Sequence, residues 1–207
     1  MVLGMEYRRL GSSGMYVSEI SYGNWITHGS QVESDAAVKC VRTAYDLGIT
    51  TFDTADVYAA TKAESVLGKA LKGMKRESYE LFTKVYWPTG TGKNDRGLSR
   101  KHIIESCNAS LKRLQTDHID LYQMHHIDRS APLDEIWQAM DRLITQGKII
   151  YVGSSNFPGW GIAQTNERRG SQQQLGLVSE QGLYNLFTRH AELEVIPACQ
   201  GYGVGLL

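Results

Sequence analysis

Short runs of apolar and β-branched residues alternate with longer amphipathic segments through most of this sequence. Such runs, bounded by glycine, proline or small polar residues, are typical of buried strands. Strands are expected at residues 20–26, 49–52, 79–84, 118–125, 149–154 and 175–181, and a seventh begins at residue 202. Because helical segments separate the strands, the pattern predicts βαβ units and a parallel sheet, either an open doubly wound sheet or a barrel.

Four of the intervening segments combine apolar residues at helical spacing with residues typical of helix ends. Side chains that accept a hydrogen bond from the first turn mark helix starts, and glycine marks helix ends. The expected starts are a cap at Ser34, a capping box formed by Thr61 and Glu64, a cap at Ser99 and Pro132 in a first turn, and the expected ends are Gly48 and Gly147.

The first twenty residues have a different pattern. Two short β-prone runs, residues 7–10 and 16–20, flank the glycine- and serine-rich residues 11–14. This arrangement predicts a β-hairpin. A phosphate-binding loop is excluded because no helix follows the glycines.

Composition predicts one ordinary globular domain over residues 1–207, because 42% of the residues are hydrophobic and 21% are charged. Lysine and arginine together number 22, as do aspartate and glutamate, so the net charge is zero. No overall field therefore favours nucleic acid or an anionic membrane surface.

Several features predict a cytoplasmic protein that does not insert into a membrane. No stretch reaches the roughly 20 apolar residues of a membrane span. Residues 1–6 are too short and too polar for a signal peptide. Cys40, Cys107 and Cys199 lie far apart in helical segments, which is typical of reduced thiols in a protein core.

Three successive predicted strands each end in an ionisable residue, namely Asp53, Lys84 and His125. Taken singly, each has an ordinary structural explanation: a helix cap, an exposed strand end and a hydrogen-bonded buried histidine. Parallel strands bring their carboxyl ends to the same edge, so together the three predict a site there.

Asp53, Tyr58 five positions later, Lys84 and His125 match, in order, the residues of the aldo-keto reductase family. Residues 94–103, 120–125 and 153–157 are also similar to this family, most closely to its branch with potassium-channel β-subunits. The resemblance covers essentially the whole chain. It implies a (β/α)8 TIM barrel whose bottom is closed by the N-terminal hairpin, which favours the barrel over the open sheet.

The resemblance implies NADPH-dependent reduction of an aldehyde or ketone, a small-molecule carbonyl substrate, to an alcohol. Tyr58 would be the general acid, and Lys84 would lower the pKa of its phenol. Asp53 would hold Lys84 charged and oriented. His125 would hydrogen-bond the carbonyl oxygen. The hydride would come from the nicotinamide.

Cofactor contacts follow from the same resemblance. Ser155, Asn156 and Gln181 match the residues that hydrogen-bond the nicotinamide carboxamide, although ordinary strand-end turns also explain the Ser-Asn pair. Trp25 and Trp87 are candidates for an apolar substrate wall. The other positions matched to the cofactor site are Gly23, Asn24, Trp25 and Asp53.

No metal site is expected. His125 and His126 are adjacent in a predicted strand, so their side chains should point to opposite faces and cannot bind one ion together.

Length raises a further expectation, since a barrel of this type runs to about 250 residues. The chain is expected to stop within the seventh strand, before the segment that holds the adenosine 2′-phosphate, and to associate into a homo-oligomer through its open edges or be poorly stable. Two alternatives to an enzyme remain: a cofactor-binding regulatory subunit similar to the channel β-subunits, or an inactive fragment. The β-subunits lack the family histidine, so His125 favours the enzyme.

Overall fold

The computed structural model describes residues 4–207. The prediction that residues 1–6 are too polar for a signal peptide therefore falls partly outside the described residues. An antiparallel pair, β1 (Tyr7–Arg9) with β2 (Tyr16–Ser18), precedes a seven-stranded parallel sheet. In sheet order the strands are β3 (Tyr22–Gly23), β4 (Thr51–Asp53), β5 (Glu80–Val85), β6 (Ile119–Met124), β7 (Ile149–Ser155), β8 (Ser179–Gln181) and β9 (Gly205–Leu206). The helices are α1 (Ser34–Asp46), α2 (Lys62–Leu71), α3 (Arg100–Leu114), α4 (Leu133–Thr145), α5 (Gly159–Ser171) and α6 (Val195–Tyr202), with short 3₁₀ turns at Arg76–Ser78 and His190–Glu192.

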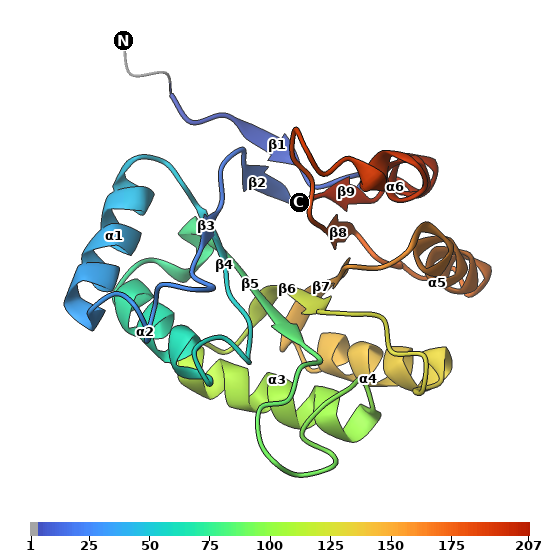
Figure 1. Cartoon of the computed structure of the whole chain (residues 1–207), viewed down its shortest axis with the longest axis horizontal. Coiled ribbons are helices and arrows are strands. Elements are labelled where there is room, and N and C mark those ends of the chain that lie inside the picture. The colour runs from blue at the N-terminus through green and yellow to red at the C-terminus, as the bar shows by residue number, and fades with distance from the viewer. Residues whose placement is uncertain (1–3) are drawn as a thin grey trace.

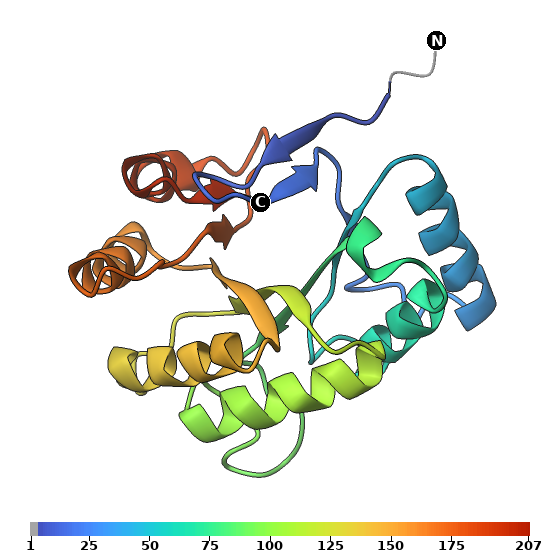
Figure 2. The same ribbon diagram turned by 180° about the vertical axis from the view of Figure 1, so that it is seen from behind.

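The parallel sheet follows the order of the chain from β3 to β9. Figure 1 and Figure 2 show that it curls and that the α-helices lie on its outer side. Successive parallel neighbours with outer helices are the arrangement of a (β/α)8 barrel. The predicted fold class and the N-terminal hairpin are both confirmed.

Apolar residues pack on both faces of the curled sheet. A large outer cluster between strands and helices includes Phe52, Ile103 and Met140. On the inner face, Leu10 and Val17 of the hairpin join a second cluster with Phe82, Leu121 and Val178. Phe82 lies two residues before Lys84 in the same strand. The hairpin therefore fills the inner space below the carboxyl ends of the strands.

The hairpin is also tied to the end of the chain. The backbone nitrogen and the side-chain oxygen of Ser12 both donate to the carbonyl of Gly203, at 2.7 and 3.0 Å. Gly11 is packed so closely here that a β-carbon would lie 2.3 Å from that same oxygen. Glycine is required at this position, because its φ of 57° is also left-handed.

Some predicted helix ends are confirmed. The Ser99 hydroxyl accepts a hydrogen bond from the backbone nitrogen of His102 at 3.2 Å, as a helix cap does. Gly48 and Gly147 follow α1 and α4 with left-handed φ values of 92° and 67°. Both glycines end their helices for the expected reason.

Other helix starts differ from the prediction. Ser34 is already inside α1, and neither it nor Glu33 makes a side-chain cap. Thr61 precedes α2 with a φ of 74° and no side-chain cap, so the capping box is wrong. Glu64 instead accepts hydrogen bonds from partners distant in the sequence. Pro132 occupies the position before the first turn of α4 rather than the turn itself.

Three further predictions need correction. Only Tyr22 and Gly23 of the strand expected at residues 20–26 pair with β4. Tyr202 is the last residue of α6 rather than the start of a strand. Cys40 is exposed and not in the core, whereas Cys107 and Cys199 are buried. Helix α5 was not predicted at all, because Gly159, Gly161 and Gly170 and many polar residues obscure its period.

Among the helices of residues 4–207, none has the length and apolar character needed to cross a lipid bilayer.

Candidate functional site

Lys84 and Asp53 form a buried ion pair at the carboxyl ends of two neighbouring strands. Lys84 Nζ donates to Asp53 Oδ1 at 2.7 Å, to Oδ2 at 2.6 Å and to the carbonyl of Thr54 at 2.8 Å. Asp53 is paired in register with Phe82 of β5. Side chains alternate along a strand, so Lys84, two residues after Phe82, lies on the same inner face as Asp53. All three ammonium hydrogens thus have an acceptor, and burial of the charge is compensated.

Tyr58 lies over this pair, in the turn between β4 and α2. Lys84 Nζ is 5.2 Å from the centroid of the Tyr58 ring. The His125 ring meets it edge-on at 5.6 Å between centroids, and the Trp25 ring lies at 6.3 Å. The sequence prediction that Asp53, Tyr58, Lys84 and His125 converge agrees with this geometry. Their catalytic roles stay predictions.

The backbone after Tyr58 is unusual. Ala59, Ala60 and Thr61 all have left-handed φ values, of 49°, 51° and 74°. Each costs free energy in a residue with a side chain, so the surrounding structure must hold this turn in place. The turn fixes where the Tyr58 phenol lies relative to the ion pair.

Burial and the charge of Lys84 act on Tyr58 in opposite directions. Loss of hydration raises the pKa of the phenol, and the Lys84 ammonium lowers it by a smaller amount. The net pKa is therefore raised, whereas the sequence analysis expected a lowered one. The phenol consequently keeps its proton throughout the neutral range, as a proton donor must.

His125 follows the last residue of β6, and its backbone nitrogen donates to the carbonyl of Val85 at 3.0 Å. Burial, with smaller contributions from Lys84 and His126, lowers the pKa of its imidazole to about 3. The ring is thus neutral near pH 7. Its buried Nδ1 has no hydrogen-bond partner in the described part of the chain.

His125 and His126 both lie just past the end of β6. Strand β6 ends at Met124, so strand alternation does not apply to the two histidines. The Trp87 ring contacts both, at 6.4 Å from His125 and 5.7 Å from His126 between centroids. Within residues 4–207 no group of three or more metal-binding side chains is placed to hold an ion.

Gln123 belongs to the site and was not predicted. Its Nε2 donates to Asp53 Oδ1 at 3.2 Å and to Gln181 Oε1 at 3.3 Å. Gln181 Nε2 in turn donates to Asp53 Oδ2 at 3.3 Å. The pairing of β5 with β6 sets Gln123 opposite Lys84, so the two side chains share the inner face. The two amides complete the shell around the carboxylate.

Ser155 and Asn156 lie beside Gln181. Asn156 Nδ2 donates to Ser155 Oγ at 2.9 Å, and the Asn156 backbone nitrogen donates to the Gln181 carbonyl at 3.0 Å. The serine hydroxyl keeps a hydrogen to donate, and the exposed asparagine keeps a side-chain oxygen to accept. A donor next to an acceptor is what a carboxamide group requires, so these residues fit a nicotinamide.

Gly23, Asn24 and Trp25, the three residues predicted from the first strand, differ in their exposure. Trp25 is 69% exposed next to Tyr58, and Gly23 is exposed. Asn24 is buried, and its Nδ2 donates to the Ala63 carbonyl at 3.2 Å and lies 3.3 Å from His28 Nδ1. The Asn24 side chain thus fastens its loop to α2, and the structure does not bring it to the cluster.

A second buried acid lies just outside the cluster. Asp56 is fully buried, its Oδ2 accepts from Ser106 Oγ at 2.6 Å, and its backbone nitrogen donates to the Lys84 carbonyl at 3.2 Å. Burial raises the pKa of the Asp56 carboxyl to about 7. The residue connects the Tyr58 turn to both β5 and α3.

Comparison with known proteins gives one family and several relatives. Residues 19–207 match the model of the Aldo/keto reductase family. An uncharacterized oxidoreductase, YrpG, of Bacillus subtilis (strain 168) is 44% identical over an alignment that covers 98% of this chain and 65% of the relative.

Two further relatives are named as channel subunits. A probable voltage-gated potassium channel subunit beta of Arabidopsis thaliana is 40% identical over 98% of this chain and 62% of its own length. A putative subunit of the same kind from Schizosaccharomyces pombe is 41% identical over 97% of this chain and 60% of its own length. The chain thus spans less than two thirds of the length of these relatives.

Proposed function

The chain belongs to the aldo/keto reductase family, and from that premise we propose that it is the catalytic part of an oxidoreductase that reduces an aldehyde or ketone to an alcohol with NADPH. The observation that carries the proposal is the contact of Tyr58 and His125 above the ion pair of Lys84 and Asp53. A proton donor, a neutral hydrogen-bonding ring and a fixed positive charge meet at one strand edge.

Tyr58 supplies the proton in this proposal. As the carbonyl becomes an alkoxide, the phenol gives up its hydrogen and is left as a phenolate. Lys84 stabilises that phenolate through its nearby positive charge. Asp53 keeps Lys84 in place, because both carboxylate oxygens accept from the ammonium.

His125 orients the carbonyl. A neutral imidazole offers one N–H to the substrate oxygen and brings no competing charge beside Lys84. Aligning the carbonyl lowers the entropy cost of reaching the reactive geometry.

The cofactor would be held by Ser155, Asn156 and Gln181, whose donors and acceptors suit its carboxamide. When bound, NADPH supplies the hydride that no side chain can provide. Gln181 also contacts Asp53, so the proposed cofactor contact and the ion pair share one hydrogen-bond network.

A second candidate is a regulatory subunit that binds the cofactor and docks on a membrane protein. The names of the Arabidopsis and Schizosaccharomyces relatives favour it. The presence of His125 in contact with Tyr58 favours the enzyme.

The test is Tyr58→Phe in the protein expressed at its full natural length. We expect kcat for carbonyl reduction to fall about 10²–10⁴-fold, the range for a lost general acid, with cofactor affinity nearly unchanged. NADPH oxidation across a panel of carbonyls, with cofactor binding measured by fluorescence, decides the matter. Wild-type kcat in the variant would end the assignment of Tyr58. An inactive wild type that binds cofactor would favour the regulatory subunit.

A further inference from the structure

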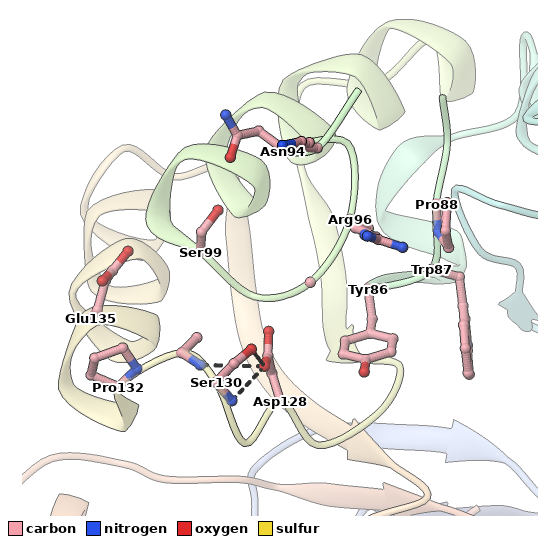
Figure 3. Close-up of a pocket in the computed structure, with 13 residues that line it drawn as sticks. Tyr86, Trp87, Pro88, Asn94, Arg96, Ser99, Asp128, Ser130, Pro132 and Glu135 are labelled. Atoms are coloured by element: carbon pink, nitrogen blue, oxygen red, sulfur yellow. Dashed lines mark hydrogen bonds between the residues drawn. The ribbon is translucent and has the colours of Figure 1, made fainter. Parts of the chain in front are cut away.

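A pocket of about 610 Å³ lies beside the proposed reaction centre. The loop between β5 and α3 and the loop between β6 and α4 enclose it. Figure 3 shows Tyr86, Trp87 and Arg96 on one side and Pro132 and Glu135 on the other. Ligands of barrel enzymes bind among the loops at the carboxyl ends of strands, which is where this pocket lies.

The acidic side chains in this pocket wall already have partners. Asp128 Oδ2 accepts from the Leu98 nitrogen at 2.8 Å. Its Oδ1 accepts from the Ser130 nitrogen at 2.9 Å, as Figure 3 shows. Glu135 Oε1 accepts from the Arg100 nitrogen at 3.0 Å. Backbone amides thus balance part of both negative charges.

Two cations in the same wall, unlike these acids, have no side-chain hydrogen-bond or ion-pair partner among the described residues. Lys93 and Arg96 both line the pocket, and neither forms an ion pair or side-chain hydrogen bond with another described residue. Asp95, which lies between them in the sequence, accepts from the Gly92 nitrogen within its own turn. The charged side chains of this wall that have no hydrogen-bond or ion-pair partner among residues 4–207 are therefore both positive.

Aromatic side chains in the pocket wall connect it to the reaction centre. The Tyr86 ring meets the Trp87 ring edge-on at 5.0 Å between centroids. Trp87 also contacts His125, at 6.4 Å. One indole thus lies between the pocket and the histidine proposed to orient the carbonyl. The Trp87 ring therefore offers an apolar surface that borders both His125 and the pocket lined by Lys93 and Arg96.

We propose that this pocket selects carbonyl substrates with a flat apolar body and an anionic group, such as aromatic aldehydes that carry a carboxylate. The proposal rests on the reductase function proposed above. Arg96 would bind the carboxylate through its planar guanidinium, Lys93 would add a second positive charge, and Trp87 would pack on the ring. The pocket makes Arg96 a residue that determines specificity and gives it no part in the chemical step.

The experiment compares 4-carboxybenzaldehyde with benzaldehyde in wild type, Arg96→Gln and Lys93→Gln, at low salt. We expect wild type to prefer the carboxylate and the ratio of the two kcat/KM values to fall about tenfold in Arg96→Gln, as for a lost hydrogen bond to a charged group. Arg129→Gln is the matched control. Arg129 is an exposed cation of the loop between β6 and α4 that does not line the pocket, so its substitution should leave the ratio unchanged.

Two outcomes would overturn the proposal: a ratio that is unchanged in Arg96→Gln, or an equal fall in Arg129→Gln. If no carbonyl is reduced at all, the proposed function fails, and the pocket is then tested by binding alone. Benzoate should quench the tryptophan fluorescence of wild type, and this quenching should be absent in Trp87→Phe. Arg96→Gln should weaken benzoate binding about tenfold. Quenching that is insensitive to Arg96 would exclude the anionic subsite in its own right.

Discussion

Lys84 donates hydrogen bonds to both carboxylate oxygens of Asp53, at 2.7 and 2.6 Å, and only 1% of the lysine and 7% of the aspartate is exposed. A charged pair so well removed from water is weak evidence of a contribution to stability, because desolvation offsets the attraction. Its position below Tyr58 gives it a clearer use, since it keeps a positive charge beside the phenol.

Substitution of Lys84 by methionine should abolish turnover. It should also destabilise the protein by about 3–5 kcal/mol, because Asp53 would remain buried without its partner. The Lys84 ammonium lowers the pKa of Tyr58, so its loss should raise that pKa. The high-pH limb of any residual activity should therefore lie at a higher pH than in wild type. A pH profile of kcat and a denaturant titration check both effects. The double variant Asp53→Asn/Lys84→Met should recover part of the stability without the activity, and an unshifted pH profile in an active variant would argue against the proton relay.

Removal of Asn156 or Gln181 should weaken cofactor binding. Each alanine variant leaves part of the carboxamide without a partner, at a cost of about 1–3 kcal/mol. Gln181→Ala should also reduce kcat, because the same side chain donates to Asp53. Gln172→Ala, an exposed glutamine after α5, is the control. Equal cofactor affinity in all of these proteins, measured by fluorescence quenching, would contradict the assignment.

Asp56 should make stability fall as the pH rises through the weakly acidic range. Its ordinary pKa is 3.8, and burial raises it to about 7 in the folded protein. Between these values the folded state binds the proton and the unfolded state does not, so stability is highest at the acid end and is lost as the carboxyl ionises. The full effect is about 4 kcal/mol, at 1.36 kcal/mol for each pH unit.

Asp56→Asn isolates this effect, since the amide keeps an oxygen for Ser106 and cannot ionise. Denaturant titrations at several pH values measure the free energy of unfolding of both proteins. The value for the variant should increase relative to that of wild type from pH 4 to pH 7. The comparison removes the parallel contribution of Glu180, whose pKa is also raised to about 7, and the opposite one of His125. Parallel stability curves for the two proteins would show that Asp56 keeps an ordinary pKa.

Two glycines in helices should respond in opposite directions to substitution by alanine. A β-carbon on Gly68 would lie 2.6 Å from the carbonyl oxygen of Arg113, where α2 crosses α3. Overpacking of this kind costs about 1–3 kcal/mol. A β-carbon on Gly170, in α5, would meet no other atom within 4 Å, so alanine should stabilise the protein there by about 0.5–1 kcal/mol. Thermal unfolding of both variants tests the pair, and a stable Gly68→Ala protein would mean that the two helices can separate.

Strand periodicity explains why the ion pair could be predicted. Asp53 and Lys84 end apolar runs, and parallel strands align such ends. The register of β5 with β6, in which Lys84 pairs with Gln123, brings the glutamine to the same edge. Alternation does not extend to His125 and His126, because the strand ends at Met124 and the sequence does not mark that boundary.

Contacts between distant segments account for most of the differences. Thr61 and Glu64 have the spacing of a capping box, yet Glu64 accepts hydrogen bonds from Thr83 and Arg113, which lie 19 and 49 positions away. No local pattern contains those partners, so a local rule placed Thr61 at a cap. The family resemblance placed Asn24 at the cofactor mouth, whereas its side chain donates to the Ala63 carbonyl, 39 positions away.

The hydrogen bonds between Ser12 and Gly203 join residues that are 191 positions apart. During synthesis the hairpin leaves the ribosome first, and its acceptor is added at the very end of this stretch. At roughly 5–20 residues per second, about 10–40 s pass between the two events. The last buried partner of Leu10 and Val17, Val178, is also made late in that interval, so the emerging chain exposes part of an apolar hairpin that a chaperone could recognise.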